Sequence, residues 1–169
     1  MAHRVARVWT AHGLTCAVLE NLTIGHRCGY VGVWKGHPLY GVDYSSHSAV
    51  LVEPWEDVKD GPIGDRGVIP LVCRRGDEVT PDCFFDVHGG LTYSGGAKDY
   101  PIKNPLGLWW FGFDCGHAGD RCDPLLLPAR LHSYFSMQDG EVRDEQYVVE
   151  QCERLAEQLA KFKTNTEEA

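Results

Sequence analysis

The sequence lacks a long apolar stretch. No hydrophobic run approaches the roughly 18 residues that a membrane-spanning helix needs. Residues 1–4 are not followed by the apolar region of a secretory signal peptide. The seven cysteines are irregularly spaced and form neither paired C-x-x-C motifs nor another standard zinc signature. We therefore expect a cytoplasmic protein with reduced thiols and no association with a membrane.

Positive charge is also scarce, because 16 Lys and Arg residues stand against 24 Asp and Glu residues, for a net charge of −8. An acidic surface repels a phosphate backbone, so this charge argues against non-specific nucleic-acid binding. It still allows a pocket for one small anion, because net charge says nothing about a single pocket.

What the sequence does contain predicts one globular domain. Its 169 residues are 43% hydrophobic, which is typical of a chain with one sizeable core. The 19 glycines and nine prolines lie among aromatic and aliphatic runs and predict many turns and short elements. We expect one domain over residues 1–163 and a frayed polar tail over residues 164–169.

Short apolar or alternating runs predict strands that are joined by turns. In the clearest of them Trp109, Phe111 and Phe113 share one face, opposite Leu108 and Trp110. The segments between the strands lack the amphipathic helices that parallel crossovers require, so the sheet should be mostly antiparallel. The predicted strands cover residues 5–10, 14–20, 28–34, 49–53, 68–73 and 106–114.

One strong helix is predicted at residues 144–163. Asp144 suits its N-cap, and an apolar stripe repeats at helical spacing. The sequence therefore predicts an α+β fold, in which a mostly antiparallel sheet of short strands is covered by one C-terminal helix. The stripe consists of Val148, Cys152, Leu155, Leu159 and Phe162.

Three glycine-rich segments, residues 28–41, 86–94 and 109–120, carry most of the reactive polar side chains. They contain the strings CGYVGV, GHPLYG, HGGLTYSG and WWFGFDCGHAGD. Together with residues 143–160, these strings resemble an uncharacterised family of bacteriophage, prophage and bacterial proteins. Trp34 stands where the family pattern has proline. The resemblance implies an association with phage, and with it the host cytoplasm, but no particular activity.

The third segment has the residue types of a metal site. Asp114, Cys115, His117 and Asp120 directly follow an apolar strand, and glycines at 116 and 119 let that turn expose its side chains. Carboxylates, thiolates and imidazoles bind zinc, and a zinc ion with an open position activates water. The predicted ligands of such a zinc ion are His117, Cys115 and His88.

Three alternatives use the same residues differently. In the first, Cys115 is a nucleophile that His88 or His117 activates beside an aspartate. In the second, His26 and Cys28 join Cys115 and His117 to hold a structural zinc ion. In the third, the two aspartates only cap turns, the cysteine packs in the core and the histidine binds a backbone carbonyl.

Candidate substrate-binding groups lie in the same segments. The backbone N–H groups of Gly89 and Gly90, beside an imidazole, suit an anion or an oxyanion, and two glycines equally suit a β-bulge. Aromatic side chains near glycines suit a nucleobase or a sugar ring, and they equally suit a core. The other candidates are His37, Tyr40, Tyr93 and Trp110.

These features favour a small hydrolase, dependent on a metal or on Cys and His, that acts on a small polar or nucleotide-like substrate. The alternative is a phage protein without catalysis that binds or sequesters a nucleotide-like ligand or a host defence protein. An enzyme needs its reactive side chains to converge on one cleft, which separates the two hypotheses. The predicted catalytic residues are Asp114, Cys115, His117, Asp120 and His88.

Overall fold

A two-residue turn joins the first two strands. β1 (His3–Ala11) and β2 (Leu14–Asn21) pair antiparallel. Between them His12 and Gly13 have φ values of 50° and 78°, the two positive values that a type I′ hairpin requires. β3 (His26–Val33) then pairs antiparallel with β2, so residues 3–33 form a three-stranded meander.

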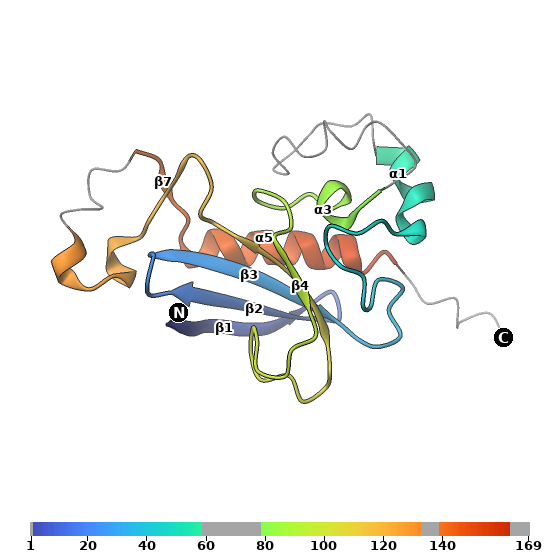
Figure 1. Ribbon diagram of the computed structural model, residues 1–169, viewed down its shortest axis with the longest axis horizontal. Coiled ribbons are helices and arrows are strands. Elements are labelled where there is room, and N and C mark those ends of the chain that lie inside the picture. Colours follow the sequence, from blue (N-terminus) through green and yellow to red (C-terminus); the bar gives the residue numbers. More distant parts are fainter. Residues whose placement is uncertain (1, 59–78, 133–138, 163–169) are drawn as a thin grey trace.

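The sheet has five strands in the order β1-β2-β3-β5-β4, and every neighbouring pair is antiparallel. The structure is a computed structural model that describes residues 2–58, 79–132 and 139–162 (Figure 1). β4 (Tyr93–Gly95) and β5 (Trp109–Asp114) complete the sheet, and α5 (Glu145–Leu159) lies along one of its faces. The predicted α+β fold, with one C-terminal helix on an antiparallel sheet, is therefore confirmed.

The cap and the apolar stripe of α5, together with a glycine of β3, explain why the helix packs closely on the sheet. The Asp144 side chain accepts a hydrogen bond from the Tyr147 N–H at 2.8 Å and caps the helix as predicted. The apolar stripe of the helix packs in the main hydrophobic core. At Gly29 of β3 a Cβ atom would come within 2.6 Å of the Phe113 ring and the Cys152 sulfur, so only glycine fits between sheet and helix.

The opposite face of the sheet carries a second, smaller core. The alternation predicted for β5 is confirmed, because Phe111 and Phe113 belong to the main core and Trp110 belongs to this one. The loop of residues 96–108 covers part of this face with Tyr100 and Ile102. The buried members of the second core are Ala17, Leu19, Tyr30 and Trp110.

Residues 49–53 do not form the predicted strand. They form a 3-10 turn, η1 (Ala49–Leu51), and the start of α1 (Val52–Val58). A run of four or five apolar residues does not distinguish a strand from a buried helix, and Pro54 falls in the first turn of α1, where it is tolerated. The predicted strand at 68–73 and the predicted tail at 164–169 lie outside the described residues.

Among the described residues, one further short helix precedes β4 and four short elements lie between β5 and α5. β6 and β7 form a small parallel pair beside the end of β5. Over the described residues, no helix combines the length and the apolar character that crossing a bilayer requires. The elements are α3 (Pro81–Phe84), β6 (Asp120–Arg121), η2 (Pro124–Leu126), η3 (Ala129–Leu131) and β7 (Glu141–Val142).

Among the described cysteines, Cys83 departs from the expected reduced state. Cys83 of α3 takes part in a disulfide bond, so the prediction of reduced thiols throughout is wrong for this residue. Burial raises the pKa of the thiol of Cys28 to about 11, and burial likewise raises that of Cys115. The thiols of Cys16, Cys28, Cys115 and Cys152 are free.

Candidate functional site

Two glutamines of α5 hold the segment of residues 86–88 against the helix. Gln158 accepts a hydrogen bond from the Asp86 N–H through Oε1 and donates one to the Asp86 carbonyl through Nε2, both at 2.8 Å. Gln151 Oε1 accepts a hydrogen bond from the His88 N–H at 3.0 Å. The two glutamines are two helical turns apart and therefore face the same side of α5, which fixes the backbone of His88.

The His88 side chain uses both ring nitrogens. Nε2 lies 2.7 Å from Oδ2 of Asp120, and Nδ1 lies 2.9 Å from the hydroxyl oxygen of Tyr147. The side chains of His88 and Asp120 are only 11% and 1% exposed. Because an ionised carboxylate only accepts hydrogen bonds, Nε2 carries a proton, and in the tautomer with its proton on Nε2, Nδ1 accepts the Tyr147 O–H. We call these three side chains the Asp120–His88–Tyr147 relay.

Asp120 is kept ionised although it is buried. Burial alone would raise the pKa of Asp120, but the Arg143 guanidinium, the His88 ring and the His117 N–H together hold it below its usual value. Arg143 Nε lies 2.8 Å from Oδ1, and the His117 N–H donates to Oδ2 at 3.0 Å. Asp120 therefore orients His88 as a fixed negative charge.

Arg143 also lies over Tyr147. Its guanidinium carbon is 4.7 Å from the centre of the phenol ring. The backbone carbonyl of Arg143 accepts a hydrogen bond at 3.2 Å from Arg27, a buried side chain of β3, which fixes the position of β7. The guanidinium therefore forms a cation–π contact with the phenol ring whose hydroxyl is hydrogen-bonded to His88.

A second imidazole lies beside the relay. The His117 ring centre is 5.6 Å from that of His88, and His117 Nε2 is 3.8 Å from Oδ1 of Asp114. The His117 side chain is 33% exposed, and its Nε2 makes no hydrogen bond. Gly89 has a φ of 67°, and a Cβ atom there would lie 2.2 Å from the His117 ring, so Gly89 makes the space in which this ring packs.

Four of the five predicted catalytic residues therefore meet: His88, Asp114, His117 and Asp120. Cys115 does not join them, which corrects the prediction of a thiol nucleophile. It is 1% exposed in the main core, and burial and the nearby Asp120 carboxylate raise its pKa. A thiol that is both buried and protonated does not attack a substrate.

The predicted zinc ligands also do not fit together. Within residues 2–58, 79–132 and 139–162, no group of three or more His, Cys, Asp or Glu side chains is arranged to hold a metal ion. In the set of His117, Cys115 and His88, both nitrogens of His88 are already hydrogen-bonded and the Cys115 sulfur is in the core. The four-residue alternative with His26 and Cys28 fails the same geometric test.

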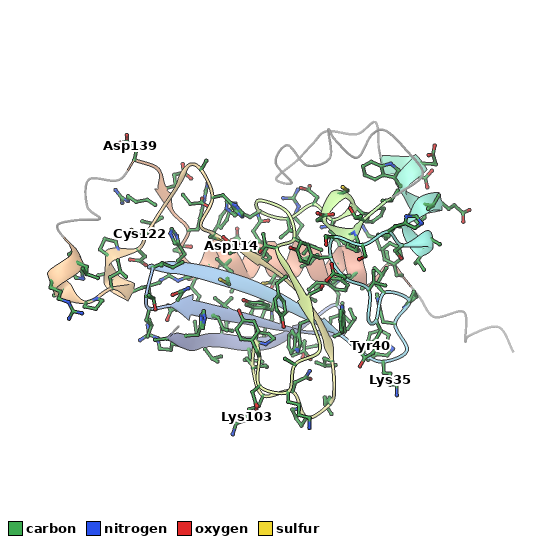
Figure 2. All side chains as sticks on the ribbon, in the orientation of Figure 1. Lys35, Tyr40, Lys103, Asp114, Cys122 and Asp139 are labelled. Atoms are coloured by element: carbon green, nitrogen blue, oxygen red, sulfur yellow. The ribbon has the colours of Figure 1, made fainter. Side chains whose placement is uncertain are left out.

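His37 and Tyr40, two predicted substrate-binding residues, lie at the other end of α5. His37 Nε2 is 3.0 Å from the carbonyl oxygen of Leu159, twelve residues and about 18 Å along the helix from Tyr147. The Tyr40 hydroxyl donates to the Gly107 carbonyl at 2.9 Å. Figure 2 shows Tyr40 at the opposite end of the molecule from Cys122, which follows β6. These residues therefore do not share a site with His88.

Tyr93 and Trp110 lie on the sheet face that is turned away from α5. Trp110 is fully buried, and Tyr93 packs edge-to-face against Tyr30 in the same small core. Gly90 also loses its predicted role, because its N–H donates to the Val87 carbonyl at 2.9 Å and is not free for an oxyanion. Of the predicted substrate-binding residues, only Gly89 touches the relay region.

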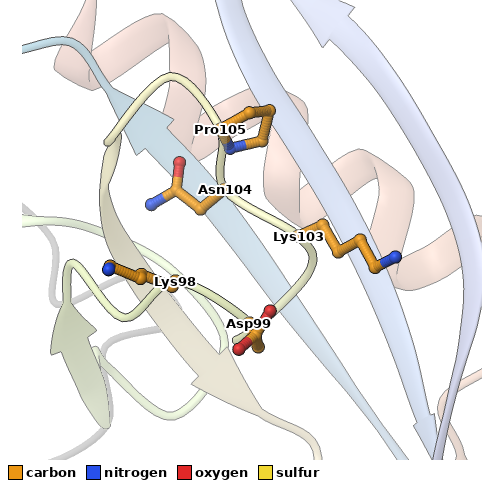
Figure 3. Close-up of a pocket in the computed structure, with 5 residues that line it drawn as sticks. All are labelled: Lys98, Asp99, Lys103, Asn104 and Pro105. Atoms are coloured by element: carbon orange, nitrogen blue, oxygen red, sulfur yellow. The ribbon is translucent and has the colours of Figure 1, made fainter.

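The loop between β4 and β5 forms a shallow depression of about 400 Å³ (Figure 3). Figure 3 shows the ammonium groups of Lys98 and Lys103 pointing away from each other, so they do not converge on an anion. The amide of Asn104 is used within the loop, because it accepts from the Leu108 N–H and donates to the Leu108 carbonyl, both at 2.8 Å. This depression is therefore a weaker candidate than the relay.

Sequence reasoning missed Tyr147, Arg143 and Gln151. A signal for two of them was present, because Tyr147 and Gln151 are four residues apart on the predicted helix and form a polar line beside its apolar stripe. Nothing in the sequence indicated that this line faces His88.

No family model, curated protein or solved structure matches the chain. The phage resemblance therefore stays a prediction, and the function must be inferred from the geometry of the relay.

Proposed function

We propose that the protein is a hydrolase whose reacting group is the Tyr147 hydroxyl, with His88 as general base and Asp120 as its orienting carboxylate. The relay is the observation that carries this proposal. A hydroxyl hydrogen-bonded to an imidazole, whose other nitrogen donates to a buried carboxylate, is the arrangement by which proteins activate weak nucleophiles.

The proposed reaction has two steps. Tyr147 gives its proton to Nδ1 of His88 as its oxygen bonds to the substrate carbonyl carbon; the leaving oxygen then departs with that proton. Water next attacks the tyrosyl ester, His88 accepts its proton, and the tyrosine oxygen leaves and regains it. Throughout, the Asp120 carboxylate stabilises the imidazolium and Arg143 stabilises the phenolate.

The side chains beside the relay support a role in binding. The His117 side chain is 33% exposed, and its Nε2, which makes no hydrogen bond, is buried against Gly89, so the exposed edge of the ring, and not this nitrogen, is the part that can contact a substrate next to Tyr147. The alternative, a phage protein that only binds a ligand or a host protein in the host cytoplasm, predicts no special reactivity at Tyr147.

A reactive probe tests the proposal without a known substrate. Benzenesulfonyl fluoride sulfonylates an activated phenol: the tyrosine oxygen bonds to sulfur, fluoride leaves and His88 takes the proton. Peptide mapping by mass spectrometry should show Tyr147 labelled on the order of 10²-fold faster than Tyr40, with that advantage lost in His88→Gln. Tyr40, whose hydroxyl only donates to a backbone carbonyl, is the internal control. Equal labelling of the two tyrosines would contradict the proposed function.

A further inference from the structure

Exposed acidic side chains surround the relay. Asp114 lies next to His117 and is 39% exposed at its side chain, and Glu141, the partner of Arg143, is 75% exposed. Asp144, which caps α5 one turn before Tyr147, is exposed as well. Figure 2 shows Asp114 at the end of β5. Each of these three carboxylates therefore contacts a residue of the relay or a residue that packs against it.

The positive groups of the same region are already paired. Arg143 is 23% exposed and lies between Asp120, at 2.8 Å, and Glu141, at 2.6 Å. Arg27, whose guanidinium touches the Arg143 carbonyl, is 10% exposed and pairs with Glu20 and Asp123.

Two further arginines do not change the excess of negative over positive charge around the relay. Arg121 directly follows Asp120 in β6, so its side chain points to the opposite side of that strand, where its Nε is buried and makes no hydrogen bond. Arg7 is 3.9 Å from Glu145, which follows the helix cap. Among the described residues that contact the relay, no arginine is left over to bind a phosphate.

We infer that the group bound next to Tyr147 is positively charged, as in an ester of an amine-bearing acid, and is not a phosphate. This inference rests on the proposed function and names its substrate class. Carboxylates that are exposed on one side of a reacting group attract cations and repel anions before contact is made. It replaces the nucleotide-like substrate that the sequence suggested, because a nucleotide phosphate would need a free cation at this position.

Sulfonyl fluorides of different charge test the inference at Tyr147 itself. The probes are 4-(2-aminoethyl)benzenesulfonyl fluoride, which is cationic, unsubstituted benzenesulfonyl fluoride, and 4-(fluorosulfonyl)benzoate, which is anionic. Each labelling rate is divided by the rate for free N-acetyltyrosine amide, which removes the intrinsic reactivity of the probe. We expect Tyr147 to prefer the cationic over the anionic probe by about tenfold at low salt, and by much less at about 1 M salt, where charges are screened within about 3 Å.

Paired charge-removing variants locate the effect. Asp114→Asn combined with Glu141→Gln should remove most of the preference. The matched control combines Asp99→Asn with Glu157→Gln, which removes the same charge from the β4–β5 loop and from the far end of α5. That control should keep the preference.

The outcomes separate the inference from the proposed function. Faster labelling by the anionic probe, or a preference that survives in the Asp114 and Glu141 variant, overturns the cationic substrate and leaves the relay intact. A Tyr147 that reacts with all three probes no faster than Tyr40 overturns the proposed function instead.

Discussion

At the scale of single residues, the site depends on a histidine with no free nitrogen and a glycine with no side chain. His88 is held between Asp120 and Tyr147, so its ring has one orientation and one neutral tautomer. Gly89 lets the His117 ring occupy the position of its missing Cβ atom. His88 and Gly89, which are adjacent in the HGG string, therefore shape the same small region of the site.

Replacing Gly89 by alanine should lower the free energy of unfolding by more than the positive φ of this residue alone explains. Gly89→Ala places a Cβ atom 2.2 Å from the His117 ring, whereas Gly13→Ala, at a similar φ of 78°, meets nothing within 4 Å. We expect Gly13→Ala to lower the free energy of unfolding by about 1–2 kcal/mol and Gly89→Ala to lower it by about 1–3 kcal/mol more. Urea unfolding measures both. Equal losses would show that His117 moves aside without cost.

Asp120 should contribute to stability above its unfolded pKa. The folded state holds the pKa of Asp120 below the usual 3.8, so the unfolded state binds more protons in that range. The contribution is present above pH 3.8 and is lost as the pH falls through the lower folded value. Urea unfolding of the wild type between pH 5 and 3 should therefore show a steeper loss than Asp120→Asn. Parallel curves would contradict this account of the carboxylate.

At the scale of elements, α5 organises the molecule through both of its ends and one polar side. Asp144 caps the first turn, and Gln151 and Gln158 bind the backbone of residues 86–88. At the last turn, buried His37 donates from Nε2 to the Leu159 carbonyl and accepts the Leu39 N–H at Nδ1. The Leu159 carbonyl also accepts the Phe162 N–H at 3.1 Å, so His37 gives this carbonyl at the helix end a second donor.

His37 should make stability depend on pH near neutrality. Burial lowers the pKa of His37 below 6.5, so the folded state prefers the neutral ring and the unfolded state binds more protons. Its contribution is present above pH 6.5 and is lost as the pH falls through the lower folded value. The loss of stability between pH 7.5 and 5.5 should be smaller in His37→Gln than in the wild type. His132→Gln, at a half-buried histidine on η3, is the control.

At the scale of the whole molecule, the two faces of the sheet pack against different parts of the chain. The face under α5 carries the main core and, at the start of the helix, the relay. The other face carries a small aromatic core under the loop of residues 96–108. The hydrolase prediction placed all the predicted site residues in one cleft. In the structure they lie on both faces of the sheet and at both ends of α5, so they do not form one cleft.

A substitution in the small core should affect stability but not the relay. Trp110 is fully buried, and its indole N–H has no hydrogen-bond partner. Trp110→Phe therefore loses packing without breaking a hydrogen bond, and we expect the free energy of unfolding to fall by about 1–3 kcal/mol. The labelling ratio of Tyr147 to Tyr40 should stay as in the wild type. A changed ratio would show that the two faces are coupled.

The sequence by itself determined the local features of this protein. The alternation in β5, the Asp144 cap, the apolar stripe of α5 and the turn at Gly13 each depend on residues within a few positions of one another, where spacing fixes which side chains share a face. The same local reasoning was wrong at residues 49–53, because so short an apolar run fits a strand and a helix equally well.

Only the tertiary structure decided which polar side chains meet. His88 is 32 residues from Asp120 and 59 residues from Tyr147, and their contact depends on how α5 docks across the sheet. Cys115 and His117 are only two residues apart, yet Cys115 enters the core and His117 stays partly exposed, because β5 ends at Asp114 and the chain bends between the two residues. Residue types indicated reactive chemistry in this region, and only the packing of helix on sheet placed the Tyr147 hydroxyl, and not the Cys115 thiol, against His88.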